Sequence, residues 1–149
     1  MMEMILFSGI PAAGKSRLFK ERFVDTHLRI NLDMLRTRHR ESLLVNACLE
    51  AKQPFVVDNT NLTPEHRARY IAPARAARFR VVGYRFHVAL AVAIARNAGR
   101  TGRAMVPEHA LRSALRQWQP PDWAEGFDAL IEVWSEDDGF QLLEIDRAQ

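Results

Sequence analysis

Near its N-terminus the chain reads Gly9-Ile10-Pro11-Ala12-Ala13-Gly14-Lys15-Ser16 (GIPAAGKS). This segment fits the pattern G-x-x-x-x-G-K-[ST], which binds phosphate when a strand precedes it and a helix follows it. The apolar run at residues 4–7 predicts a buried strand over residues 4–8, and residues 15–24 have the apolar spacing of an amphipathic helix. The segment therefore predicts a phosphate-binding loop, or P-loop.

The residue types in this loop each have a chemical reason. Gly9 and Gly14 allow the backbone to turn so that successive N–H groups point at phosphate oxygens, and the helix N-terminus adds positive potential. We expect Lys15 to reach the β- and γ-phosphates of ATP and the Ser16 hydroxyl to ligate Mg²⁺. The residues expected to bind the nucleotide here are Gly9, Pro11, Ala12, Ala13, Gly14, Lys15, Ser16 and Arg17.

Strand and helix patterns alternate along the rest of the chain. This alternation predicts an α/β P-loop NTPase or kinase fold, with a parallel sheet of about five strands and helices on both faces. We expect a single domain over residues 1–149. Thr63 and Pro64 have the residue types of a helix N-cap and first helical position. The further strands expected are 28–31, 54–58, 80–88, 130–135 and 140–145, and the further helices include 41–51, 90–97 and 107–118.

Basic residues are distributed unevenly. Of 21 Lys and Arg residues, 18 are arginine, and residues 64–116 hold eleven arginines against two acids. Such a basic segment suits a polyanion, either ATP with a small phosphorylated acceptor or ATP with a nucleic acid, although it also suits a solvated surface. No apolar stretch approaches the roughly 20 residues that span a bilayer, which favours a soluble, cytoplasmic protein with no membrane partner.

Two carboxylates are candidates for the acceptor side of the site. Asp33 and Arg36 follow the strand expected at residues 28–31, at the carboxyl edge that also carries the P-loop. A kinase needs a carboxylate there to orient the acceptor hydroxyl and take its proton. Asp58 ends the strand expected at residues 54–58, where a carboxylate helps to organise Mg²⁺ or an acceptor-side network.

Residues 97–106 are rich in arginine and glycine and predict a small lid. Arg96, Arg100 and Arg103 surround Gly99 and Gly102 ahead of a proline. Arginines supply charge for a transferring phosphoryl group and glycines supply hinge freedom. We expect Arg96 and Arg103 to contact the nucleotide.

Four segments, GIPAAGKS, NLDMLR, DNTNLTPEHR and RNAGRTGRAMVPEHAL, together resemble the polynucleotide 5′-hydroxyl kinase family, AAA-type P-loop kinases. The downstream WAEGFD is also similar, and the resemblance spans residues 9–128. It implies that Asp33 is the general base toward a DNA or RNA 5′-OH, that Arg36 contacts the acceptor phosphate, and that Arg100 or Arg103 stabilises the transferred phosphoryl group. It places Asp58 and Asn61 near the acceptor, and it implies a role in nucleic acid repair.

Three functions remain open from the sequence. The first is a nucleic acid 5′-kinase that uses ATP and Mg²⁺. The second is a kinase of a small hydroxyl acceptor, such as a sugar, nucleoside or antibiotic, for which a closed acceptor pocket would be expected. The third is a nucleotide-dependent RNA-binding module, which the similarity of VPEHAL and EGFD to the nucleotide-binding domain of heterogeneous nuclear ribonucleoprotein U suggests.

Overall fold

The computed structural model describes residues 2–102, 105–136 and 138–147. One six-stranded sheet runs through this part of the chain in the order β2-β3-β1-β4-β5-β6. Its strands are β1 Glu3–Ser8, β2 Leu28–Ile30, β3 Phe55–Asp58, β4 Arg80–His87, β5 Ala129–Glu136 and β6 Gly139–Glu144. The helices are α1 Lys15–Arg22, α2 Leu32–Leu35, α3 Arg38–Ala51, α4 Pro64–Ala76, α5 Leu90–Ala98 and α6 Glu108–Gln117, with a 3₁₀ turn at Trp123–Glu125.

The first five strands are parallel, as the alternation of strands and helices predicts. The sixth differs, because β6 pairs antiparallel with β5. The sequence predicts a strand near residues 140–145, but the direction of β6 is set by the short turn that connects it to β5. Only two residues separate Glu136 from Gly139, whereas a parallel pair needs a crossover of a dozen residues or more.

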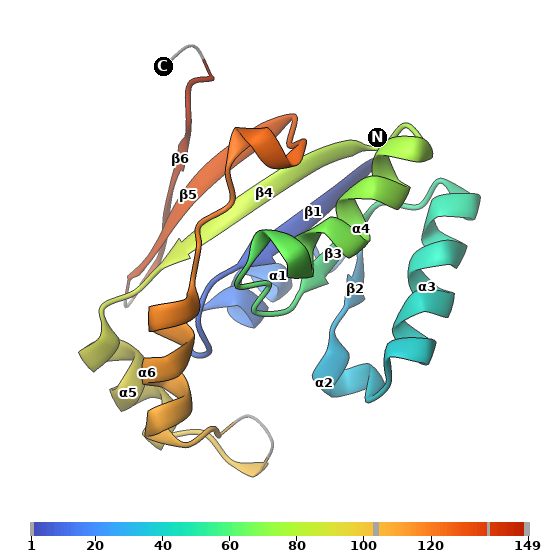
Figure 1. Cartoon of the computed structure of the whole chain (residues 1–149). Coiled ribbons are helices and arrows are strands. Elements are labelled where there is room, and N and C mark those ends of the chain that lie inside the picture. Colours follow the sequence, from blue (N-terminus) through green and yellow to red (C-terminus); the bar gives the residue numbers. More distant parts are fainter. Residues whose placement is uncertain (1, 103–104, 137, 148–149) are drawn as a thin grey trace.

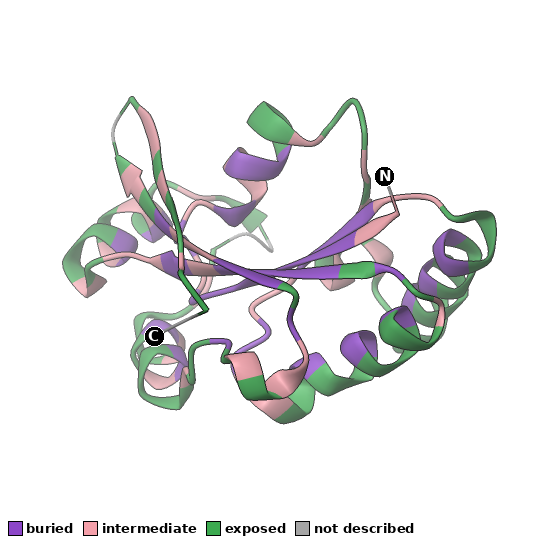
Figure 2. Cartoon of the chain, turned by 90° about the horizontal axis from the view of Figure 1, so that it is seen from above, coloured by how far each residue is buried: buried purple, intermediate pink, exposed green. Residues whose placement is uncertain are grey.

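Helices cover both faces of the sheet, so each buried strand has two apolar faces (Figure 2). In β1, Met4 and Leu6 belong to the cluster that packs against α3 and α4. Ile5 and Phe7 point the other way and pack with residues of α1, α5 and α6. This arrangement is the two-sided burial of a parallel strand, and it confirms the predicted fold class.

Local signals position several helix ends. Thr63 is the N-cap of α4, where its hydroxyl accepts a hydrogen bond from the backbone N–H of His66 at 3.3 Å, and Pro64 is the first helical residue. A separate short helix, α2, lies between β2 and α3, and the cap of Thr37 begins α3 at Arg38. Within the described ranges no helix is long and apolar enough to cross a membrane.

The order of the strands brings the candidate site residues together at one edge of the sheet. Strand β1 lies at the centre of the sheet with β3 beside it and β2 next along (Figure 1). Because the carboxyl ends of parallel strands meet at one edge, the segments that follow β1, β2 and β3 come together there.

Candidate active site

The loop from Gly9 to Ser16 joins β1 to α1, as its pattern predicts. A Cβ on Gly9 would lie 2.8 Å from the Cβ of Phe86, because the end of β4 passes directly against the loop. Gly14 caps α1 with φ 98°, and Ala12 has φ 66°, both in the left-handed region. The two glycines of the pattern therefore meet a close approach at one position and a left-handed backbone at the other.

The Lys15 side chain is folded into the loop. Its Nζ donates hydrogen bonds to the carbonyl oxygens of Gly9 at 3.0 Å and Ile10 at 2.7 Å, and only 8% of the residue is exposed. Burial lowers the pKa of Lys15 to about 8; Asp58 raises it, Arg100 lowers it and Asp33 raises it. The ammonium group thus lies within the electrostatic reach of all three charged groups.

Ser16 and Asp58 form the pair predicted to organise Mg²⁺. The Ser16 hydroxyl donates to Oδ2 of Asp58 at 2.9 Å, and Asp58 is 2% exposed. A hydroxyl and a carboxylate are hard oxygen donors of the kind that Mg²⁺ prefers, so these residues fit that ion. The arrangement brings the start of α1 and the end of β3 together across the β1–β3 pair.

Arg29 of β2 completes this cluster, and the sequence interpretation did not include it. Its Nε donates to Oδ2 of Asp58 at 2.8 Å, and its second guanidinium nitrogen donates to the Ser16 hydroxyl at 2.8 Å. The one local sign of its role in the sequence is that a charged residue lies inside a short strand that leads to the same edge of the sheet as the P-loop. Its partners lie 13 and 29 residues away in sequence, so only the fold reveals them.

A cavity of 540 Å³ lies at this edge of the sheet. Asp33 of α2 and Arg100 of the predicted lid line this cavity. They share it with P-loop residues predicted to bind phosphate and with Asp58 of β3, which is predicted to bind metal. Arg36 does not line it; this residue is exposed at the C-terminus of α2. The predicted site residues that line the cavity are Pro11, Ala12, Lys15, Ser16, Asp33, Asp58, Asn61 and Arg100.

Side chains fix the position of the short helix that carries Asp33. The Asn31 side chain accepts a hydrogen bond from Met34 N at 2.9 Å and donates to the carbonyl of Asp58 at 2.6 Å. Leu32 N donates to the side-chain oxygen of Asn59 at 2.8 Å. Helix α2 is therefore anchored to the end of β3, which sets where Asp33 lies in the cavity.

A buried carboxylate lies behind Asn59. Glu41 is 3% exposed and accepts hydrogen bonds from Tyr70 at 2.8 Å, Arg38 at 2.9 Å and Asn59 at 3.1 Å. Burial, with the Glu41 hydrogen bond and charge, raises the pKa of Tyr70 to about 12, so the phenol remains a donor. Sequence reasoning missed this network because its members come from separate elements.

The segment expected to be a lid begins in α5. Asn97 donates to the carbonyl of Val106 at 2.6 Å and accepts from its N–H at 2.9 Å, so the two ends of residues 97–106 are joined. Arg96 donates to the Ser135 hydroxyl at 2.7 Å and to the carbonyl of Ala12 at 3.4 Å. Burial and the neighbouring Arg96 lower the pKa of Arg100, with Asp58 opposing them. Arg103 lies outside the described residues.

The β5–β6 hairpin supports the other side of the P-loop. A Cβ on Gly14 would lie 3.0 Å from a ring carbon of Phe140. The guanidinium of Arg17 stacks 4.5 Å from the Phe140 ring centre and donates to the carbonyl of Glu136 at 3.2 Å. Arg17 thus lies against β5 and β6 and does not line the cavity.

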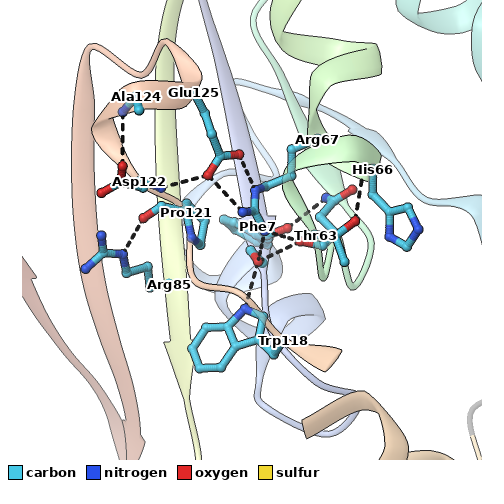
Figure 3. Close-up of polar contacts among 12 residues, drawn as sticks. Phe7, Thr63, His66, Arg67, Arg85, Trp118, Pro121, Asp122, Ala124 and Glu125 are labelled. Carbon is cyan, nitrogen blue, oxygen red and sulfur yellow. Dashed lines mark hydrogen bonds and ion pairs between the residues drawn. The ribbon is translucent and has the colours of Figure 1, made fainter. Parts of the chain in front are cut away.

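A buried polar network surrounds the end of β1 (Figure 3). Arg67 is 0% exposed and makes two parallel hydrogen bonds to Glu125, at 2.7 and 2.8 Å. It also donates to the carbonyl of Asn61 at 2.8 Å, and the Asn61 side chain donates to the carbonyl of Phe7 at 2.8 Å. Trp118 reaches the same cluster by donating to the Ser8 hydroxyl at 3.0 Å. The network ties α4 and the 3₁₀ turn to the end of β1.

One known protein is similar to this chain in sequence over most of the chain's length. The bifunctional polynucleotide phosphatase/kinase of Schizosaccharomyces pombe (strain 972 / ATCC 24843) is 28% identical over 137 residues, which cover 88% of this chain. The match spans only 33% of that relative's length.

Two solved structures have the same fold at low identity. Kti12 of Chaetomium thermophilum in complex with ADP-AlF3 superposes with a TM-score of 0.67 at 15% identity, covering 91% of this chain and 90% of that one. A gluconokinase from Sinorhizobium meliloti 1021 superposes with a TM-score of 0.60 at 19% identity, covering 89% and 82%.

The family comparison covers most of the chain. The AAA domain model AAA_33 matches residues 4–121, from β1 through the P-loop, Asp33 and Asp58 to the segment after α6. The chain is therefore a P-loop, kinase-like protein that belongs to the AAA domain family AAA_33.

Proposed function

We propose that this protein is an ATP-dependent polynucleotide kinase, which transfers the γ-phosphoryl group of ATP to the 5′-OH of DNA or RNA. The observation that carries the proposal is that Asp33 lines the same cavity as Lys15, Ser16, Asp58 and Arg100. A nucleotide-binding loop by itself needs no carboxylate opposite its phosphates. A carboxylate beside the P-loop is what transfer to a hydroxyl requires.

The residues divide the chemistry among them. Lys15 and the N-terminus of α1 hold the β- and γ-phosphates of ATP. Mg²⁺ held by Ser16 and the Asp58 carboxylate would offset charge on the β- and γ-phosphates. Arg100 neutralises the charge that spreads over the phosphoryl oxygens during transfer.

Asp33 orients the acceptor hydroxyl and removes its proton. The hydroxyl oxygen forms a bond to the γ-phosphorus, the bond from that phosphorus to the β,γ-bridging oxygen breaks, and ADP leaves with the electron pair. The proton passes to the Asp33 carboxylate and then to solvent. Arg36 is exposed at the C-cap of α2, and we propose that it contacts the acceptor phosphate from outside the cavity. Arg17, Arg96 and Arg103 remain proposed nucleotide contacts.

Two considerations favour a nucleic acid as the acceptor. The similar segment of the Schizosaccharomyces pombe relative belongs to a protein named as a polynucleotide phosphatase/kinase. In addition, Arg38 and His66 line the same cavity as Asp33, and such side chains suit a phosphate-bearing acceptor.

A small hydroxyl acceptor is the second candidate. The gluconokinase fold likeness favours it, because the same P-loop and sheet also serve sugar kinases. In that case the cavity would accept a compact polyol, and phosphates beyond the first nucleotide would add nothing to binding. A nucleotide-dependent RNA-binding module is the third, and it leaves Asp33 without a task.

The test is transfer of labelled γ-phosphate from ATP with Mg²⁺ to short 5′-OH DNA and RNA oligonucleotides, with gluconate as a parallel acceptor. The proposal expects labelled oligonucleotides with the wild-type protein and loss of labelling with Asp33→Asn. Labelled gluconate with unlabelled oligonucleotides would favour the second candidate. Nucleotide and RNA binding with no transfer to either acceptor would favour the third.

A further inference from the structure

A second cavity, of 450 Å³, is lined by residues of α3 and α4. It shares Arg38 and Tyr70 with the lining of the active-site cavity. The two cavities therefore adjoin at this pair, whose side chains are hydrogen-bonded to each other at 2.9 Å. The second cavity forms a groove beside the acceptor side of the site, on the far side of the Arg38–Tyr70 pair.

The charge along this groove is positive where it is accessible. Its acidic residue, Glu41, is buried and already accepts hydrogen bonds from Tyr70, Arg38 and Asn59. Arg69 is exposed, and within residues 2–102, 105–136 and 138–147 its guanidinium has no hydrogen-bond or ion-pair partner. Its charge is therefore free to meet an anion.

The remaining polar lining offers hydrogen bonds to a sugar-phosphate backbone, beside the apolar side chains of Val45 and Pro73. Ser42 and Asn46 contribute a hydroxyl and an amide from α3. Tyr70, the aromatic residue of the described lining, is 3% exposed and has its hydroxyl bonded to Glu41. A basic groove that follows a sugar-phosphate backbone without stacking platforms binds independently of base sequence.

We propose that the groove between α3 and α4 holds the first phosphodiester groups of a single-stranded 5′-OH acceptor, with Arg69 contacting one of these phosphates. The inference rests on the proposed function and extends it, because it names the form of acceptor the site takes. A single strand is specified because its backbone can enter between two neighbouring helices while its 5′ end reaches Asp33. The terminal nucleotide lies in the active-site cavity, and the strand leaves past Arg38 and Arg69.

The test compares acceptors that differ only in the number of phosphates. Transfer rates are measured for a nucleoside 3′-monophosphate and for 5′-OH oligonucleotides of increasing length. In the wild type KM is expected to fall as the first phosphodiesters are added and then to level off. In Arg69→Gln that fall is reduced by about 3- to 10-fold, while kcat and the KM of the nucleoside 3′-monophosphate stay the same.

Binding without transfer separates this inference from the proposed function. Anisotropy of a labelled 5′-OH oligonucleotide, measured across salt concentrations, should show a logarithmic slope smaller by about 0.7 in Arg69→Gln than in wild type. The matched control is Arg116→Gln, which removes an exposed arginine on α6 and should behave as wild type.

The outcomes are distinguishable. Equal affinities, equal salt slopes and equal length dependence in wild type and Arg69→Gln would overturn the groove even if transfer occurs. Salt-dependent binding that Arg69→Gln weakens, with no transfer to any oligonucleotide, would support the groove and overturn the proposed kinase activity. Absence of oligonucleotide binding by the wild type would overturn both.

Discussion

The guanidinium of Arg29 lies 2.8 Å from the carboxylate of Asp58. Because Asp58 is 2% exposed, cationic groups within the site must offset its negative charge in place of water. The same guanidinium donates to the Ser16 hydroxyl, which places an arginine at the two groups proposed to hold Mg²⁺. Arg29 and Mg²⁺ therefore compete for the same oxygens.

Removing Arg29 should make the protein depend more on Mg²⁺. In Arg29→Gln the buried carboxylate loses its ionic partner, and we expect a loss of about 1–3 kcal/mol in the free energy of unfolding without metal. Added Mg²⁺ should restore more stability to the variant than to the wild type, because Asp58 has then lost its ion pair with Arg29. Thermal unfolding in EDTA and over a Mg²⁺ series measures both effects. Unchanged stability with an unchanged Mg²⁺ response would contradict the competition.

Nucleotide affinity should weaken at high pH. The pKa of Lys15 is about 8, so the ammonium form dominates below that pH and is lost above it. ATP binds the charged form, which raises the pKa in the complex, so Kd stays constant below about pH 8 and then rises by up to about tenfold per pH unit. Calorimetry with a non-hydrolysable ATP analogue between pH 7 and 9.5 measures this rise. Lys15→Met should bind weakly with no such pH dependence, and a flat wild-type profile would refute the assignment to Lys15.

Asp33→Asn should separate transfer from binding. The amide keeps the shape of the side chain but cannot take the acceptor proton, so we expect kcat to fall by about 10²- to 10⁴-fold. Nucleotide affinity should stay near the wild-type value, whereas Lys15→Ala should lose both. Asp25→Asn, an exposed carboxylate after α1, is the matched control. An equal loss of ATP binding in Asp33→Asn and Lys15→Ala would rule out a role for Asp33 in the chemical step.

Arg67 and Arg69 offer a comparison of two arginines on one helix. Arg67→Met leaves Glu125 without its bidentate partner in a buried network, so we expect a loss of about 3–5 kcal/mol in the free energy of unfolding. Arg69→Met removes an exposed side chain and should change stability by no more than about 0.5 kcal/mol. Urea unfolding at neutral pH measures both. If Arg67→Met lost as little stability as Arg69→Met, the buried network would not stabilise the fold.

Much of the fold could be predicted because its signals are local. The GIPAAGKS pattern, the apolar strands and the Thr63–Pro64 cap each lie within a few consecutive residues, and the structure confirms them. Helix α2 was less visible, because four residues carry too little periodicity to be recognised. The direction of β6 was also not predicted, since it depends on the length of one turn.

Local sequence patterns predicted the P-loop between β1 and α1, the α/β class, Asp33 after β2 and Asp58 at the end of β3. Contacts between distant segments depend on how the chain folds. Arg29 contacts Asp58, Asn59 links the buried Glu41 to α2, and the cavity is lined by Asp33 and Arg100 but not by Arg36. The reason is sequence separation. A loop or cap is formed by neighbouring residues, whereas Ser16 meets Asp58, 42 residues away, only because the sheet order places β3 beside β1 and β2 beside β3.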